Sequence, residues 1–555
     1  MSQTQTTPEP YTAISHIGPH TFAEFIEEAR RFHGYPAPGL IIGGIMVQAA
    51  RRRLPEGVLF DAISEASSCL PDAVQILTPC TAGNGWLRVI DLGRYALTLF
   101  NKHTGEGVRV ALDPEKLQDW PEFRDWFFKA KSKPEQDVDR LREEMRLAGE
   151  SVLRIEPAQV KPEHVGKTSK GPIRACPLCG EAYPERTGRI CLGCQGRAPV
   201  ESELHRASRE GPNLRAVPVE EAVGRHVAHD MTQIEPGVSK GPAFTRGQAV
   251  MPGDVCRLQQ MGRQRVYLLD EDENKDWVHE DEAARLFAGA LAPDGSVEPA
   301  GPPREGKVTL NASHDGLLAV DEEALEAFNL APRVMAATRP HAALVEKGEA
   351  VAATRAIPLH LSRSETEAAL ATLAGAEPVR VLPLRKARAG LLITGTEVFQ
   401  GLIEDRFEPI LTRKLEEFGG EVVKSLIRPD DREAIASGLR ELLDAGCDLV
   451  ITTAGLSVDP DDVTRQALLD AGAEDLLHGM PVLPGAMTLT GRIGQTDLIG
   501  VPACALYFAV TSLDLLLPRI LAGLRLSRRD LARLGAGGMC AECEVCRFPH
   551  CPFGK

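Results

Sequence analysis

Eight of the 13 cysteines stand in two short clusters, a pattern that predicts metal binding. The first cluster has two C-x2-C pairs, separated by 11 residues, with a glycine in each turn. Each pair can place two thiolates on one ion, and the segment between the pairs is too short to fold without it. The spacing predicts a zinc ribbon with a structural ion, and a redox dithiol is the alternative. The ligands would be Cys176, Cys179, Cys191 and Cys194.

The second cluster lies in the last 16 residues and has the spacing C-x2-C-x2-C-x4-C-P. Iron–sulfur proteins use the run C-x2-C-x2-C-x3-C-P, so this chain has one extra residue before the last cysteine. Zinc and a [4Fe–4S] cluster both remain open, and His550 is an alternative ligand for one thiolate. The predicted ligands are Cys540, Cys543, Cys546 and Cys551.

Three segments rich in Gly, Thr or Ser follow apolar runs in the C-terminal third, at 394–397, 452–459 and 501–503. Backbone N–H groups in such turns can approach an anionic ligand that carries a phosphate. Asp459, Asp461 and Asp462 follow the second run and are available to hold a cation, for which Mg²⁺ is a candidate.

The elements that would position these segments alternate between strands and helices. Apolar strands are predicted at 389–395, 421–427, 447–455 and 497–502, and a helix begins at Asp430 with Glu433 in a capping box. Strands that are apolar along their length indicate a doubly wound parallel sheet covered on both faces. In such folds ligands bind at the carboxyl ends of the strands, where all three segments fall.

The runs TGTEV, ITTAGLSVDPDDVT, LPGAM and GVPACALYF resemble, in order, the landmarks of the molybdopterin-binding domain family. That family includes molybdopterin adenylyltransferases and molybdenumtransferases. The runs AVGRHVAHDMTQIEPG and VEKGEAVAATRAIPL resemble the companion region of the molybdenumtransferases. The chain departs from the family at Ala486 and at Ala503-Cys504, which favours binding over full molybdenumtransferase catalysis.

The resemblance implies a pocket for the pterin and its phosphate. Its lining would be Thr394, Gly395, Thr396, Glu397, Thr453, Gly455, Ser457, Asp462, Pro484 and Gly485. In a catalytic version, Asp462 with Asp459 or Glu397 would position the incoming metal near the dithiolene. Family members commonly form dimers or trimers, so a homo-oligomer is expected.

The N-terminal part has a mixed pattern of helices and strands. A helix capped by Thr21 is predicted first, a second helix spans 61–77, and two strands follow on either side of Gly93. These features predict an α+β domain over residues 1–155.

The runs FHGYPAPGL, SCLPDAVQILTPCTAGNGWL and DLGRYALTLF resemble the E-subunit family of formylmethanofuran dehydrogenase. The family implies a metal, which would be zinc. Tyr35 and Ala37 stand where a second histidine and a cysteine are expected, leaving His33, Cys69 and Cys80 as candidate ligands. The alternative is that all three are ordinary core residues.

Composition limits the classes of function. With 555 residues, the chain should hold three or four domains. A net charge of −15 argues against a nucleic-acid partner. The N-terminus lacks the basic and apolar regions of a secretory signal, and no apolar run is long enough to span a bilayer, so a cytoplasmic location without a membrane partner is expected.

The predicted architecture is multidomain α/β and α+β. Its parts are an α+β domain at 1–155, a zinc ribbon at 171–200, a β-rich molybdenumtransferase-like region at 216–385, a molybdopterin-binding domain at 386–528 and a metal-binding tail at 529–555. Together they predict a protein that binds molybdopterin, or its adenylylated form, and assists metal insertion or cofactor delivery to a molybdenum or tungsten enzyme. The alternative is a non-catalytic accessory protein, or a redox or metal sensor, in a formylmethanofuran-dehydrogenase-like or formate-dehydrogenase-like system.

Overall fold

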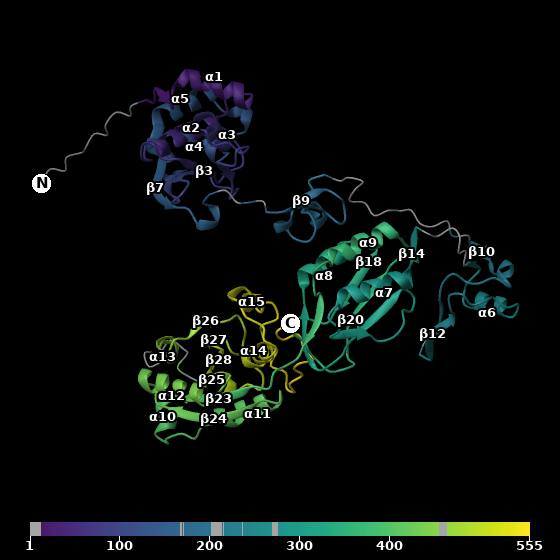
Figure 1. The fold of residues 1–555 in the computed structure, drawn as a ribbon. Helices are drawn as coiled ribbons and strands as arrows, with labels where there is room; N and C mark the ends of the chain where they lie inside the picture. Colours follow the sequence, from purple (N-terminus) through teal and green to yellow (C-terminus); the bar gives the residue numbers. More distant parts are fainter. Residues whose placement is uncertain are drawn as a thin grey trace. The chain divides into compact units, whose positions relative to one another are not determined.

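The computed structural model describes residues 13–166, 169, 171–200, 214, 216–235, 237–268, 276–453, 455 and 463–555. The chain divides into two compact units, residues 1–170 and 171–555 (Figure 1). Each unit buries apolar side chains of its own. Within the described residues, no helix has both the length and the apolar composition to cross a membrane.

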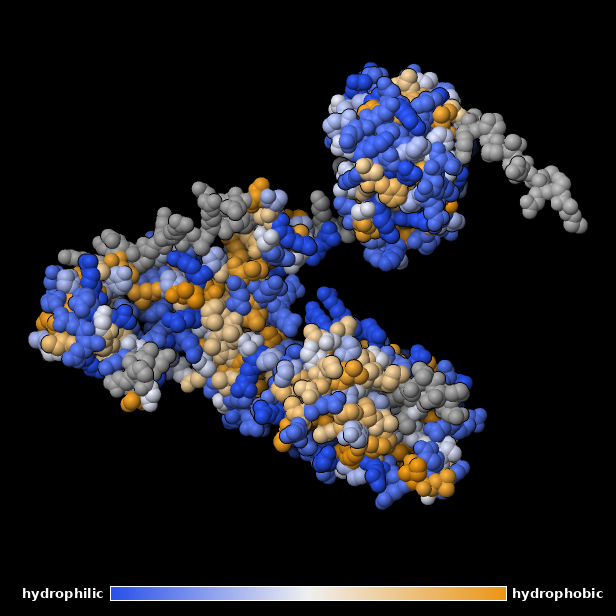
Figure 2. Space-filling view, turned by 180° about the vertical axis from the view of Figure 1, so that it is seen from behind, coloured by the Kyte–Doolittle hydropathy of each residue, from blue (hydrophilic) through white to orange (hydrophobic). Residues whose placement is uncertain are grey.

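The first unit is built on a five-stranded sheet. Its strand order is β4 (Leu87–Val89), β3 (Phe60–Ser64), β5 (Ala96–Asn101), β6 (Glu106–Leu112) and β7 (Leu153–Gln159). The helices are α1 (Phe22–His33), α2 (Pro38–Arg51), α3 (Leu70–Leu77), α4 (Pro121–Phe127) and α5 (Val138–Ala148). Helix α2 is buried from Gly39 to Ala50, and hydrophilic side chains cover most of the visible face of this unit (Figure 2).

Two sequence expectations for this unit need correction. The helix expected over 61–77 is strand β3 followed by the shorter helix α3. Strand β3 is buried throughout and pairs on both sides, so the ladder hydrogen bonds outweigh the local helical pattern. The strands on either side of Gly93 do form, but they do not pair with each other, because β3 lies between them.

The middle region is β-rich and forms two parts. The smaller part pairs β10 (Ala216–Pro218) with β13 (Arg265–Tyr267) and β11 (Met231–Glu235) with β12 (Ser239–Phe244), beside α6 (Asp254–Gln260). The larger part has a sheet of order β15 (Val297–Pro299), β16 (Lys307–Ala312), β20 (Ala350–Ala356) and β18 (Val334–Thr338). Beside it lie a sheet of β19 (Leu344–Val345), β17 (Gly316–Val320) and β22 (Val379–Leu382), a pair of β14 (Trp277–His279) and β21 (His360–Ser362), and helices α7 (Glu280–Leu291), α8 (Glu322–Asn329) and α9 (Arg363–Thr372).

The C-terminal domain is an α/β layer structure on a six-stranded sheet. The strand order is β24 (Glu421–Arg428), β23 (Arg388–Thr394), β25 (Leu449–Thr453), β28 (Thr496–Val501), β27 (Leu489–Ile493) and β26 (Glu474–His478). The first four are parallel, as the apolar runs predict. Strands β27 and β26 run antiparallel to their neighbours, so the sheet is mixed rather than wholly parallel.

Helices cover both faces of this sheet. Helices α11 (Phe407–Glu416) and α14 (Ser512–Leu521) share one core with Leu391 and Ile393 of β23. Helices α12 (Arg432–Asp444) and α13 (Thr464–Asp470) share the other core with Leu392. Consecutive residues of a strand point to opposite faces, and an apolar run is therefore what a doubly covered strand requires. The short helix α10 (Thr396–Phe399) follows β23, and α15 (Arg528–Arg533) follows α14.

Candidate functional site

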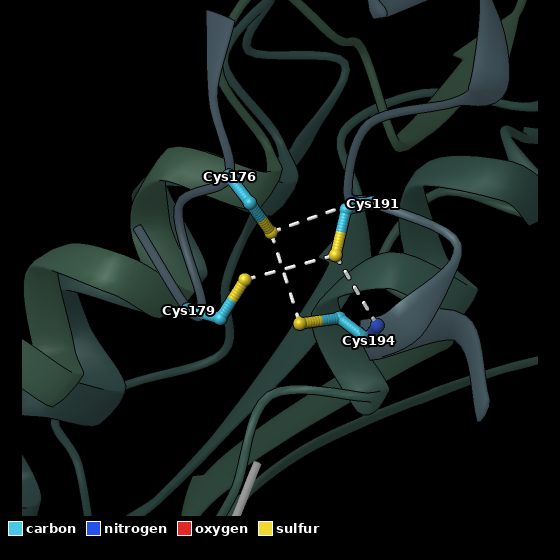
Figure 3. A group of neighbouring side chains, drawn as sticks. All are labelled: Cys176, Cys179, Cys191 and Cys194. Atoms are coloured by element: carbon cyan, nitrogen blue, oxygen red, sulfur yellow. Dashed lines mark hydrogen bonds between the residues drawn. The ribbon is translucent and has the colours of Figure 1, made fainter. Parts of the chain in front are cut away.

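The first cysteine cluster is gathered into one site (Figure 3). Its four sulfur atoms all lie within 4.8 Å of one another, with Cys176 and Cys194 3.8 Å apart and Cys179 and Cys191 3.7 Å apart. Tetrahedral zinc with Zn–S bonds of about 2.3 Å places its thiolates about 3.8 Å apart, so the geometry fits one zinc ion.

Backbone amides support the charge that this site would carry. The Cys191 amide donates to the Cys176 sulfur at 3.4 Å. Burial raises the pKa of the Cys176 thiol, but N–H groups of Cys191, Cys179 and Leu178 outweigh it and lower the pKa to about 7. Since metal ligation needs thiolates, a lowered pKa favours binding.

The module differs from the expected ribbon in its second half. The first pair of cysteines belongs to the hairpin of β8 (Ile173–Ala175) and β9 (Ala182–Pro184). The second pair stands at the start of the helical turn Gly193–Arg197, where a ribbon would have another hairpin. Tyr183 and Ile190 pack against the site, together with Ala327 of α8.

The second site lies at the carboxyl ends of the parallel strands. From β23 the chain passes to β24 on one side and then crosses to β25 on the other. The strand order thus reverses between β23 and β25, and open α/β sheets bind ligands at such a point. Strand β27 starts at this same edge, because Leu489 pairs with Gly500 near the end of β28. All three predicted segments and the turn at Pro484 therefore meet at one edge.

Hydrogen bonds tie the first segments of this edge together. The Thr394 hydroxyl donates to the Thr453 carbonyl. Both the amide and the hydroxyl of Thr396 donate to Asp430, at 2.8 and 3.1 Å. The Asp430 amide in turn donates to the Thr396 hydroxyl at 3.2 Å. Glu397 is exposed in α10.

Buried hydroxyl groups and close backbone contacts shape the space beyond β25. The hydroxyls of Thr453 and Thr464 are buried and have no hydrogen-bond partner within the described residues. Gly455 has φ +59°, and a Cβ there would overlap the Thr464 hydroxyl. The backbone at Gly455 therefore has room for no side chain. Ser457, Asp459, Asp461 and Asp462 lie outside the described residues.

The turn at Pro484-Gly485 packs on the start of α14. A Cβ at Gly485, where φ is +117°, would overlap the Ser512 hydroxyl. The Ser512 amide donates to the Pro484 carbonyl at 3.1 Å, and the Thr488 hydroxyl donates to the Gly485 carbonyl at 2.8 Å. The turn is thus held against the amino end of a ten-residue helix, where unpaired N–H groups favour anions.

The sequence motifs do not mark three residues of this edge: Asp430, Thr464 and Ser512. The local pattern assigns Asp430 to a helix start, but the cap of α12 is Asp431, whose side chain accepts from the Ala434 amide. The available signal is the position of Asp430 just after a predicted strand, at the same edge as the other motifs.

In the first unit, the three predicted metal ligands do not converge. His33 Nε2 lies 3.9 Å from the Cys69 sulfur, and His33 Nδ1 lies 2.6 Å from the Asp72 carboxylate. Cys80 is buried, and its thiol donates to the Phe60 carbonyl at 3.4 Å. Burial raises the pKa of Cys80 to about 11, which fits the core alternative for this residue. Asp72, which the sequence motifs do not mark, orients the His33 ring.

The tail cysteines are arranged differently from the first cluster. All four line one cavity of about 300 Å³ together with Tyr507, Phe508 and Phe548. Among the described residues, only the first cluster brings three or more such ligand atoms within 4.8 Å of one another. Cys543 and Cys546 are exposed, whereas Cys540 and Cys551 are partly buried.

Family models match four parts of the chain. Residues 32–161 match FmdE, described as molybdenum formylmethanofuran dehydrogenase operon, and residues 167–201 match an FmdE treble clef zinc finger. Residues 390–522 match a probable molybdopterin binding domain. Residues 216–270 match a domain of unknown function.

Two solved structures are similar to separate parts of the chain. An FmdE-like protein of tungsten formylmethanofuran dehydrogenase from Syntrophus aciditrophicus is 49% identical over 34% of this chain and 100% of that one, with a TM-score of 0.31. The molybdopterin biosynthesis enzyme MoaB from Thermus thermophilus is 22% identical over 25% of this chain and 99% of that one, with a TM-score of 0.21.

A curated relative overlaps only in part. A probable S-adenosyl-L-methionine-binding protein of Archaeoglobus fulgidus is 32% identical over 191 residues, which are 30% of this chain and 51% of that protein. The chain spans about half the length of this relative and 24% of a CinA-like protein of Mycobacterium marinum.

Proposed function

Since the chain belongs to the FmdE family and joins that domain and its zinc finger to a molybdopterin-binding domain, we propose that it binds molybdopterin and prepares or delivers it for a molybdenum or tungsten enzyme. The observation that carries the proposal is the edge between β23 and β25. There the Thr396–Asp430 pair, the unpartnered Thr453 hydroxyl and the side-chain-free backbone at Gly455 lie at the point where the strand order reverses.

The residues of this edge suit an anionic ligand with a phosphate. The Thr453 and Thr464 hydroxyls can donate to phosphate oxygens, and each would gain the partner that it lacks within the described residues. Asp430 fixes the Thr396 side chain and backbone, so that this turn does not rearrange when the ligand arrives. The turn at Gly485 with the start of α14 adds a second group of N–H donors.

The metal-handling part of the proposal rests on the acidic residues after β25. Asp462, with Asp459 or Glu397, would hold the incoming metal, or Mg²⁺ during its insertion, near the dithiolene. The FmdE domain and the zinc finger would then recognise the client enzyme. A sensor that only binds the cofactor is the competing role, and conversion of bound molybdopterin in the presence of molybdate or tungstate separates the two.

Binding can be tested with one double variant and a matched control. Full-length protein is incubated anaerobically with molybdopterin and passed over a desalting column, and the retained pterin is oxidised and measured by fluorescence. T396V combined with D430N removes the pair at the strand ends. D444N makes the same charge change at the exposed far end of α12, on the opposite edge of the sheet.

We expect the double variant to bind at least about ten-fold more weakly, since about 1.4 kcal/mol is the loss of one or two hydrogen bonds. D444N should bind like the unmodified chain, and both proteins should keep the same circular dichroism spectrum. Undiminished binding by a folded double variant would place the pterin elsewhere and overturn the proposed site.

A further inference from the structure

We propose that the C-terminal tail holds a [4Fe–4S] cluster, ligated by Cys540, Cys543, Cys546 and Cys551, on the surface of the molybdopterin-binding domain. The inference rests on the geometry of the tail alone and does not depend on the proposed function. Its alternative is a second zinc ion, which the spacing of the cysteines leaves open.

The first argument is the contrast between the two cysteine clusters of this chain. The finger cysteines stand at 3.7 and 3.8 Å, the separation of thiolates on one zinc ion. The tail cysteines are not gathered in this way, although all belong to the described residues. A cubane cluster puts each thiolate on a different iron, and the four sulfurs must then stand farther apart than on a single ion.

The second argument is the space that the tail cysteines surround. All four line the same cavity of about 300 Å³, which leaves room for a body larger than one ion. Tyr507 and Phe508 contribute to its wall, with their ring centroids 4.9 Å apart, and Phe548 and Phe553 contribute further aromatic surface. An aromatic wall limits the access of water, and solvent exposure is one of the factors that set the potential of a cluster.

The third argument is that the tail is anchored at both ends. The Cys540 amide donates to the Leu483 carbonyl, and the Leu483 amide donates to the Gly538 carbonyl, both at 2.8 Å. At the other end Phe553 is 3% exposed and shares a core with α14. A Cβ at Gly554 would overlap the Leu515 side chain. Both anchors fix the cysteine loop to the domain, so its position does not depend on the cluster alone.

The first anchor also places the tail beside the candidate pterin edge. Leu483 directly precedes the Pro484-Gly485 turn, which packs on Ser512. Tyr507 and Phe508 follow the end of β28, at the same edge of the sheet. The cluster would therefore sit next to the turn that is expected to hold the phosphate.

The test is metal and sulfide analysis of the full chain after anaerobic purification from iron- and zinc-supplemented cells. The variants are C543S and C546S, whose exposed side chains can change to serine without opening a space in the core, with C176S for the finger. C256S is the matched control, because Cys256 is also exposed and lies in α6, outside both clusters.

We expect about four iron and four sulfide per chain, with the broad visible absorption of a cluster that bleaches with dithionite. C543S and C546S should lose iron and sulfide but keep about one zinc, C176S should lose zinc and keep iron, and C256S should change neither. Thermal melts by circular dichroism show whether each variant is folded. A chain with about two zinc ions and no sulfide, of which the tail variants lose one zinc, would overturn the proposal, as would tail variants that keep their iron.

Discussion

Cys69 and Cys80 of the first unit differ in surroundings although both follow the same family pattern. Cys69 is partly buried, with φ at +59°, and faces the His33 ring at 3.9 Å. Burial, with a contribution from the Asp72 carboxylate, raises the pKa of Cys69, while Cys80 is fully buried with a pKa of about 11. The thiolate is the reactive form, so access and pKa both favour Cys69.

We predict that Cys69 is alkylated by iodoacetamide at pH 8 at least about ten-fold faster than Cys80 in the native chain. Peptide mass spectrometry after timed quenching measures both rates in one sample. In denaturant the two rates should become similar, because the difference comes from the folded surroundings. Equal rates in the native chain would contradict the separation of these two thiols.

Residue roles can be predicted where sequence spacing alone encodes the geometry. The four finger ligands stand in two short pairs, so their convergence follows from the chain itself. The roles of Asp72 and Asp430 escape such a prediction, because their partners His33 and Thr396 are 39 and 34 residues away. Such contacts depend on how helices and strands pack, and a local pattern does not contain that information.

At the scale of elements, the β14–β21 pair and the start of α7 bury three titratable groups. The rings of His279 and His360 lie 5.3 Å apart. Burial, with the Arg246 charge second, lowers the pKa of His279 to about 3 and that of His360 to about 4. Burial, with Asp281 second, raises the pKa of Glu280 to about 7.

These shifts give the stability of the middle region a defined pH dependence. Below about pH 6.5 the unfolded chain binds protons that the two folded histidines refuse until about pH 3 to 4, so the free energy of unfolding falls as pH falls through this window. Glu280 acts in the opposite sense between about pH 7 and 4.5, as one group against two. The net effect is lower stability at pH 5 than at pH 7.

We predict that the urea midpoint of the middle region falls between pH 7 and 5, and that H279N with H360Q reduces this change. Trp277 is the one tryptophan after residue 170, so replacing Trp86, Trp120 and Trp126 by Phe leaves a fluorescence signal from β14 alone. The matched control is E298Q, which removes an exposed carboxylate of β15 and should leave the pH dependence unchanged. A midpoint that is independent of pH in the chain with both histidines would contradict the burial argument.

Elements with one dominant signal can be predicted, and elements set by tertiary pairing cannot. The parallel strands β23 and β25 of the C-terminal sheet are apolar along their length because both faces are covered. Strand β26 is only partly buried and carries Glu474 and Asp475, so nothing apolar marks it. The local pattern assigns strand β3 to a helix, because its neighbours in the sheet lie far along the chain.

At the scale of the whole molecule, the division at residues 170 and 171 has a measurable consequence. The finger and all its ligands belong to the second unit, and each unit has its own cores. Loss of zinc should therefore weaken one unit and leave the other unchanged, since bound metal contributes its binding free energy only to the part that it holds.

We predict at least two transitions in differential scanning calorimetry. A zinc chelator should lower the midpoint of a transition that belongs to residues 171–555 and leave the transition of residues 1–170 unchanged. C176S should reproduce the chelator effect, and adding chelator to this variant should change nothing more. A single transition that shifts as a whole would show that the two units unfold as one.

The finger also has a consequence beyond its own fold. Arg189 stands between the two pairs of zinc ligands, and its guanidinium donates to the Ala374 carbonyl at 2.9 Å, just past the end of α9. Free carbonyls at the end of a helix gain most from such a cation. The middle region contributes no zinc ligand among the described residues, yet one of its helices is capped from a loop that the ion holds in place. The nutritional supply of zinc to a growing cell would thus set how long this neighbouring region survives proteolysis.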